Sequence, residues 1–140
     1  MTTAAFTAID TSVAIPLLVT SHPHHVPVIE WARGRTLGLC GHALTETYSV
    51  LTRLPGDARV APADAVALID DNFPAPAQLG ARASRSAYRE FARRGVAGGA
   101  AYDGLIALAA REHGVVLATR DARARSTYEA LGATTEVIAS

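Results

Sequence analysis

Short apolar runs alternate along the chain with longer segments of helical periodicity, which predicts strands separated by helices. The clearest strand candidate is the continuous apolar run at residues 115–119, because such a run is typical of a strand buried on both faces of a parallel sheet. The remaining strand candidates are residues 4–9, 37–40, 78–81 and 134–138.

Helices are predicted where apolar side chains recur every three or four positions. Residues 42–54 show this period, and residues 101–113 are apolar on almost every side, which indicates a buried helix. Pro16 interrupts the candidate helix 11–20 and favours a kink or an early end. The other helix candidates are residues 26–33, 62–73, 84–94 and 122–131.

This order of elements predicts a single α/β domain. Strands separated by helices form βαβ units, so we expect a mostly parallel central sheet of four to five strands with helices on both faces. The 140 residues suffice for one domain, and we assign residues 1–140 to it.

Cysteine content and apolar run length exclude several classes of protein. Cys40 is the only cysteine, so no internal disulfide and no thiolate zinc site are expected, and the thiol fits a small buried hydrophobe. No apolar run approaches the roughly 20 residues that span a bilayer, and no basic residue precedes Arg33 as in a signal peptide. We therefore expect a cytoplasmic protein with no membrane partner.

The charged residues narrow the function further. All 13 basic residues are arginine, and without lysine the usual P-loop site and a pyridoxal-phosphate Schiff base are excluded, so no nucleotide cofactor is expected. Residues 82–125 combine nine arginines with four acids in a chain of zero net charge. Arg85 and Arg89 lie on one face of the helix 84–94 and are candidates for nucleic-acid phosphate contacts; a solvated helix face is the alternative.

Two acidic residues follow predicted strands directly. Asp10 comes after the first strand and Asp121 after the run 115–119. Because the carboxyl ends of parallel strands meet at the ligand-binding edge of a sheet, we expect these carboxylates to lie close together. The alternative for each is a helix N-cap, worth about 1 kcal/mol.

Two further acids lie next to apolar helix surfaces. Asp103 is in the first turn of the buried helix 101–113, where an ionised carboxylate is costly unless a cation or strong donors face it. A favourable interaction with the helix dipole is the alternative. Glu46 flanks the apolar stripe of the helix 42–54 and either joins the other acids or extends outward into solvent.

Convergence of Asp10, Glu46, Asp103 and Asp121 would raise their pKa values or require a cation, because carboxylates in one pocket repel one another. An all-oxygen set suits Mg²⁺, with Mn²⁺ as a substitute. Metals held in this way activate water and screen developing charge in phosphodiester hydrolysis. The four acids are therefore candidates both as metal ligands and as catalytic residues, holding one or two ions, with a 5′-phosphate product expected.

The local sequences around these acids resemble those of the PIN-domain ribonucleases, and within them the VapC toxins of toxin–antitoxin pairs. The resemblance covers nearly the whole chain and depends on the segments 9–12, 44–46, 98–103 and 117–121. It implies a metal-dependent endoribonuclease that cleaves RNA, forms a homodimer and is neutralised by a VapB-type antitoxin. The family's acidic site falls on the same four residues. Gly104 departs from the pattern, since alanine is more usual after the aspartate.

Several neighbouring residues are open to two interpretations. Thr119 and Arg120 adjoin Asp121, where a hydroxyl can orient water and an arginine can bind phosphate; β-propensity alone also explains the threonine. His42 fits a helix start better than a catalytic role. The remaining candidates lack the spacing of metal ligands and are expected in a surface loop: His22, His24 and His25.

Rival functions with acidic sites fit the chain less well. A haloacid-dehalogenase phosphatase needs a second aspartate where this chain has Ser12, and it needs a lysine, as does a receiver domain. A 5′-nuclease acting on DNA structures usually carries additional helices. A non-catalytic PIN-like module that binds RNA or protein remains the alternative, although it has no need of four repelling carboxylates.

Overall fold

Four short parallel strands form the centre of the molecule. The structure is a computed structural model that describes residues 6–75 and 77–139. The strand order is β2-β1-β3-β4, with Ile9 paired to Leu39 and Ala118, and Thr119 paired to Val137. The strands are β1 (Thr7–Ile9), β2 (Leu37–Leu39), β3 (Leu117–Thr119) and β4 (Thr135–Val137). Because all pairs are parallel, the residues that follow β1 and β3 emerge at the same edge.

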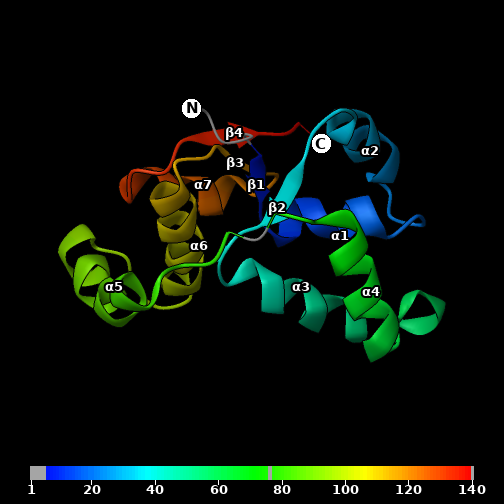
Figure 1. Ribbon diagram of the computed structural model, residues 1–140, viewed down its shortest axis with the longest axis horizontal. Helices are drawn as coiled ribbons and strands as arrows, with labels where there is room; N and C mark the ends of the chain where they lie inside the picture. Colours follow the sequence, from blue (N-terminus) through cyan, green and yellow to red (C-terminus); the bar gives the residue numbers. More distant parts are fainter. Residues whose placement is uncertain (1–5, 76, 140) are drawn as a thin grey trace.

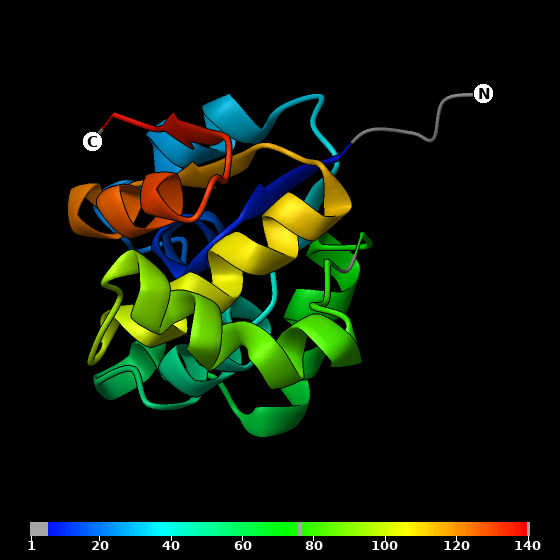
Figure 2. The same ribbon diagram turned by 90° about the vertical axis from the view of Figure 1, so that its left-hand side faces the viewer.

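Helices cover both faces of this sheet, which confirms the predicted α/β fold. Figures 1 and 2 agree in placing α6 on one side of the strands and α2 on the other. No helix in the described residues is long and apolar enough to cross a membrane. The helices are α1 (Thr11–Leu18), α2 (His25–Ala32), α3 (Ala43–Thr52), α4 (Pro62–Asn72), α5 (Ala81–Arg94), α6 (Ala100–His113) and α7 (Ala122–Ala130), with a 3₁₀ turn at Gly56–Ala58.

The predicted strand at residues 78–81 is wrong. Only Ala77 makes a single parallel bridge, to Cys40, and α5 begins at Ala81. The backbone N–H of Gly80 donates to the Glu112 side chain at 3.0 Å. The Glu112 carboxylate of α6 thus accepts from the N–H group that would otherwise donate to a neighbouring strand. Of the predicted strand at 4–9, residues 4 and 5 lie outside the described residues.

Pro16 shortens the first helix without breaking it. The helix α1 continues past Pro16 and ends at Leu18, two residues before the predicted end. Proline has no N–H, so the carbonyl of Ser12, its acceptor four residues earlier, lacks its usual partner within the helix. Arg120 occupies this acceptor: its Nη1 donates to the Ser12 carbonyl at 3.3 Å.

Gly104 allows α5 to pack closely on α6. A Cβ at this position would lie 2.6 Å from Cε1 of the buried Phe91 ring and 3.2 Å from Cδ1 of Leu131. The ring of Phe91 fills the space that alanine would need, which explains the departure from the family pattern at this position.

We expect Gly104→Ala to lower the thermal unfolding midpoint. Alanine gains about 1 kcal/mol of helix propensity, but overpacking a core contact costs about 1–3 kcal/mol. Thermal unfolding of the wild type, Gly104→Ala, Phe91→Leu and the double variant tests the cause. In the Phe91→Leu background the alanine should be neutral or stabilising; an equal loss in both backgrounds would contradict this account.

Candidate functional site

Four carboxylates from four elements surround one small pocket at the carboxyl edge of the sheet. Asp10 follows β1, Glu46 lies in α3, Asp103 in the first turn of α6, and Asp121 follows β3. The pocket has a volume of about 120 Å³, and its other lining residues are Thr11, Ser12, Ala124 and Tyr128. The structure therefore brings together all four acids that the sequence analysis singles out.

The Asp10 carboxylate is buried and accepts hydrogen bonds on both oxygens. Its Oδ1 accepts from the backbone N–H of Ser12 at 3.1 Å and from the Ser12 hydroxyl at 2.6 Å, and the Tyr128 hydroxyl donates to Oδ2 at 2.7 Å. Burial raises the pKa of Asp10, and these hydrogen bonds oppose the rise. Asp10 is also the N-cap of α1, so the capping role predicted as an alternative does not remove this side chain from the pocket.

Ser12 connects the ends of β1 and β3. Its Oγ accepts from the backbone N–H of Arg120 at 2.8 Å and lies 3.3 Å from Oγ1 of Thr119. Since the single Ser12 hydroxyl proton goes to Asp10, Thr119 is the donor in the second contact. Oγ1 of the buried Thr119 in turn accepts from the backbone N–H of Asp121 at 3.0 Å. Thr119 thus contributes its hydroxyl, and not only its β-propensity, to the support of the two acids.

Arg120 points toward α1 and is not among the residues that line the pocket. Besides the bond from Nη1 to the Ser12 carbonyl, its Nε is buried without a hydrogen-bond partner in the described residues. This side chain therefore fastens β3 to α1 in the structure.

Glu46 and Asp121 are each held by neighbouring donors. The Thr11 hydroxyl donates to Oε1 of Glu46 at 2.6 Å, so Glu46 turns toward α1 and not outward into solvent. Oδ1 of Asp121 accepts from the backbone N–H groups of Arg123 at 2.9 Å and Ala124 at 3.3 Å, which makes Asp121 the N-cap of α7. Like Asp10, Asp121 therefore caps a helix and also lines the pocket.

Asp103 differs from the other three acids in its hydrogen bonding. Its carboxyl oxygens have no hydrogen-bond donor among the residues that the structure describes. Burial and the charges of Glu46, Asp121 and Asp10 raise its pKa to about 6, and His42 only partly offsets the rise. The ionised form of Asp103 is therefore destabilised in the folded chain.

The donor chemistry of the pocket fits a hard divalent cation. Every side-chain donor that lines it is a carboxylate or hydroxyl oxygen, which is the ligand set of Mg²⁺ and Mn²⁺. Within the described residues, no three acidic, histidine or cysteine side chains lie close enough together to hold a metal ion by themselves. Mg²⁺ commonly binds through one or two carboxylates and completes its shell with water and substrate phosphate, so an open arrangement of acids suits it.

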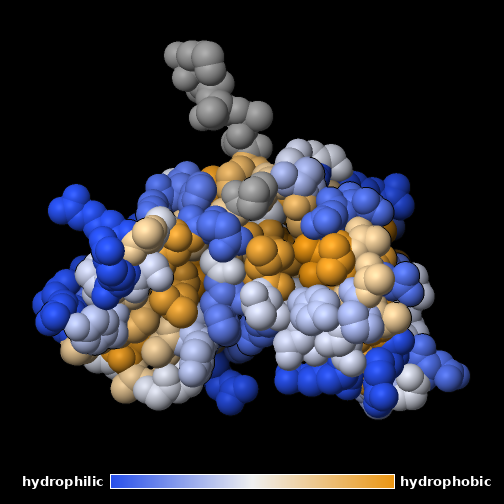
Figure 3. Space-filling view, turned by 60° about the horizontal axis from the view of Figure 1, so that its bottom comes forward, coloured by the Kyte–Doolittle hydropathy of each residue, from blue (hydrophilic) through white to orange (hydrophobic). Residues whose placement is uncertain are grey.

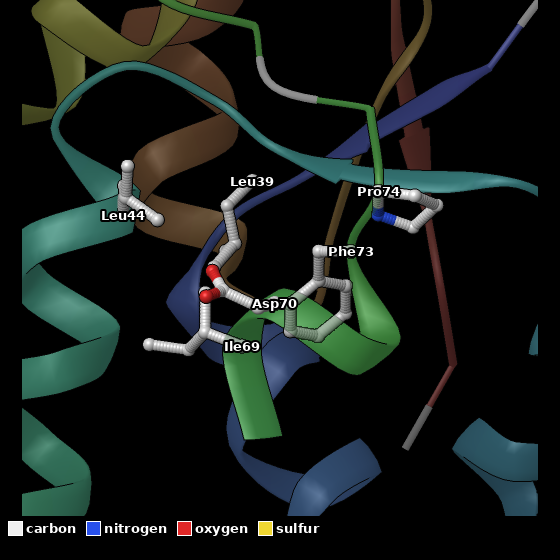
Figure 4. A pocket seen from close by; sticks show the side chains of 6 residues that line it. All are labelled: Leu39, Leu44, Ile69, Asp70, Phe73 and Pro74. Carbon is white, nitrogen blue, oxygen red and sulfur yellow. The ribbon is translucent and has the colours of Figure 1, made fainter. Parts of the chain in front are cut away.

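A larger hollow between α3 and α4 has a different character. It measures about 320 Å³ and is lined by Leu39, Leu44, Ile69, Asp70, Phe73 and Pro74; Figure 4 shows these side chains around the single Asp70 carboxylate. On the face turned forward in Figure 3, apolar side chains gather in the middle and hydrophilic ones lie around the rim. A single acid among apolar walls offers too few oxygen ligands for the cation that would neutralise a phosphate, so the smaller pocket with four acids is the candidate site.

The other predicted candidates lie outside the pocket. Arg85 and Arg89 are exposed on α5, where Arg89 lies over the ring of Tyr88. No histidine lines the acid pocket. The backbone N–H of His24 donates to Nδ1 of His22, and His25 is the first residue of α2. Cys40 is buried, and burial raises the pKa of its thiol to about 12, in agreement with an inert core residue.

The sequence analysis missed Tyr128. Residues 124 and 128 of α7 are both buried, and this spacing indicates only a core position. Burial and the nearby charge of Asp10 raise the pKa of the Tyr128 hydroxyl, so it stays protonated and donates. The only available signal was a hydroxyl within an otherwise apolar stripe.

Several known proteins are similar to this chain in sequence. A family profile described as the PIN domain matches residues 7–130. Ribonuclease VapC27 of Mycobacterium tuberculosis is 56% identical over 125 residues, covering 89% of this chain and 91% of that protein. Ribonuclease VapC40 of the same organism is 40% identical over 133 residues, covering 92% and 96%.

Solved structures show the same fold at low identity. Mycobacterium tuberculosis VapC20, described as a sarcin–ricin loop cleaving toxin, has a TM-score of 0.65 at 18% identity and covers 85% of this chain and 92% of its own. DNA-bound VapBC from Salmonella typhimurium has a TM-score of 0.64 at 19% identity, covering 96% and 98%.

We expect Asp103→Asn to raise the unfolding midpoint in EDTA at pH 7.5. The pKa of Asp103 is about 6 in the folded chain against an ordinary value of 3.8. The folded state therefore binds more protons than the unfolded state between these values, and it loses stability as the pH rises from about 4 to about 6. The asparagine removes this loss, so the two midpoints should converge near pH 4.

Thermal unfolding between pH 4 and pH 8 measures this difference. Asp64→Asn is the matched control, because Asp64 is an exposed acid in the first turn of α4. Loss of a helix-dipole interaction alone, worth about 0.3–1 kcal/mol, lowers the midpoint. If Asp103→Asn behaved like the control, Asp103 would be a helix-dipole residue and the repulsion argument would fail.

Proposed function

The chain belongs to the PIN-domain family, as its motifs predict, and we propose that it is the metal-dependent endoribonuclease toxin of a VapBC-type toxin–antitoxin pair. The observation that carries this proposal is the convergence of four carboxylates from separate elements around one pocket. Two relatives named ribonuclease VapC, at 56% and 40% identity over most of the chain, support cleavage of RNA.

Asp10, Glu46, Asp103 and Asp121 are the residues that would hold Mg²⁺ or Mn²⁺ in this proposal. Such a cation supplies positive charge that lowers the pKa of water and stabilises the phosphodiester transition state. The chain's own contribution is to fix the acids in place: Ser12 and Tyr128 orient Asp10, and Thr11 orients Glu46. Burial and the repulsion from the other acids together raise the pKa of Asp103, and a bound cation would offset both costs.

Water is the proposed nucleophile, since the hydroxyls in the pocket are already engaged. Thr11 donates to Glu46, while Ser12 and Tyr128 both donate to Asp10. None of them is paired with a histidine or lysine base, as covalent catalysis by a hydroxyl usually requires. Hydrolysis by water is proposed to leave a 5′-phosphate and a 3′-hydroxyl.

RNA as the substrate, a homodimer and a VapB-type antitoxin complete the proposal. The antitoxin is supported by fold neighbours solved as toxin–antitoxin complexes, among them VapBC from Salmonella typhimurium and VapBC2 from Rickettsia felis. A cytoplasmic location is part of the proposal, because the proposed RNA substrate would be found there. A non-catalytic PIN-like module is the alternative, and the cleavage test distinguishes the two.

We expect RNA cleavage to require Mg²⁺ or Mn²⁺ and to stop in EDTA. Asp10→Ala and Asp103→Ala should each lower the rate by at least about 100-fold, because the loss of metal-dependent charge stabilisation amounts to several kcal/mol. Asp71→Ala, which removes an exposed acid from α4, should retain the wild-type rate. The measurement is the rate of cleavage of total RNA, with end-group analysis of the products. Full activity in EDTA would rule out the proposed site.

We expect Arg85 and Arg89 to contact RNA phosphates. Replacing both with glutamine should weaken RNA binding and flatten its salt dependence, by roughly 0.7 in log–log slope for each lost contact with a single strand. Arg33→Gln with Arg53→Gln is the matched control, since both arginines are exposed outside the basic segment. Titrations at several salt concentrations measure the slope; an unchanged slope in the Arg85 and Arg89 variant would make these arginines a solvated helix face.

A further inference from the structure

Two aromatic side chains stack between the elements that carry Glu46 and Asp103. The rings of His42 and Tyr102 lie 5.0 Å apart between centroids with an interplanar angle of 28°. Tyr102 directly precedes Asp103 in the first turn of α6, and His42 is the residue before α3, four positions ahead of Glu46. Tyr102 is 58% exposed, so the pair forms an accessible aromatic surface beside the acid pocket.

Gly41 brings the two rings together. Its φ of +54° lies in the left-handed region, and a Cβ there would lie 3.0 Å from the carbonyl oxygen of Leu105 and 3.1 Å from Cβ of Ala109. Glycine therefore lets the turn between β2 and α3 lie directly on α6. The next residue, His42, then reaches the first turn of α6, where Tyr102 stands.

A polar hollow adjoins this pair. It measures about 240 Å³, against about 120 Å³ for the acid pocket, and His42 forms part of its wall. Thr45 and Leu105 extend it, three residues along each helix from His42 and Tyr102. The hydroxyls of Thr45 and Ser84 and the amide of Gln78 supply both hydrogen-bond donors and acceptors.

We propose that His42 and Tyr102 form a stacking platform for an unpaired RNA base next to the cleaved phosphodiester, and that the polar hollow receives the edge of a base. This inference rests on the proposed ribonuclease function. Single-stranded RNA is recognised through bases that stack on aromatic rings and form hydrogen bonds with their edges. A base is also the uncharged part of a nucleotide, so it can approach the four carboxylates without the repulsion that a phosphate meets.

The test uses ten-nucleotide RNA probes with 2-aminopurine at one position each, because stacking quenches the fluorescence of this base. Binding is measured in the Asp10→Asn background with Mg²⁺, so that the probe survives. We expect quenching at one or two positions. Tyr102→Ala should abolish it and weaken binding about 5- to 150-fold, the range for one lost base–aromatic stack.

Conservative variants separate stacking from a structural role. Tyr102→Phe and His42→Phe keep flat rings and should preserve most of the quenching, whereas His42→Ala should reduce it. The salt slope of binding should stay unchanged in Tyr102→Ala, because stacking releases no counterions. Thermal unfolding checks that each variant folds.

Val66→Ala is the control, since Val66 is an exposed apolar side chain on α4, away from the proposed RNA contacts. Equal losses in Val66→Ala and Tyr102→Ala, or unchanged quenching in Tyr102→Ala, would overturn the platform. In those cases RNA cleavage by the wild type would still support the proposed function. A wild type that neither binds nor cleaves RNA would overturn both.

Discussion

The buried carboxylate of Asp10 is the constraint on which the rest of the site depends. A charge at the end of a central strand is tolerated only if donors surround it, and here they come from Ser12 in α1 and from Tyr128 in α7. Ser12 can serve Asp10 because its oxygen also accepts from the backbone of Arg120. One carboxylate thereby ties β1, β3 and two helices into a single arrangement. The acid pocket is the space that this arrangement encloses.

The acids at strand ends were predictable because parallel pairing sends all carboxyl ends to one edge, whichever helices intervene. Asp103 was predictable from the apolar neighbours that make its charge costly. The absence of a strand at residues 78–81 was not predictable. The local sequence says nothing about Glu112, a residue distant in the chain whose side chain accepts from the backbone N–H of Gly80. Tyr128 was hidden for a similar reason: periodicity identifies buried positions, but it does not reveal which polar atom meets which across 118 residues of sequence.

Pro16 illustrates how a local rule has a distant consequence. A proline inside a helix predicts a kink or an early end of that helix, and α1 ends two residues after Pro16. The structure adds that the carbonyl released by the proline accepts from Arg120. The Arg120 side chain, a candidate for phosphate binding, joins β3 to α1 through this bond and is not among the residues that line the pocket. A phosphate contact by Arg120 stays a prediction. The carbonyl of Ser12, left without a helical partner, and the guanidinium of Arg120 thus form a hydrogen bond with each other.

Repulsion among the four acids links stability to function in this fold. Three of them accept hydrogen bonds from nearby donors, whereas Asp103 accepts none in the described residues. Burial and the neighbouring charges raise the pKa of Asp103 to about 6. In the absence of a cation, the raised pKa means that the ionised carboxylate of Asp103 lowers the free energy of unfolding at neutral pH. A divalent cation bound in this pocket, as proposed, would turn the repulsion among the four carboxylates into attraction to a common partner and give Asp103 the favourable contact that it lacks in the described residues.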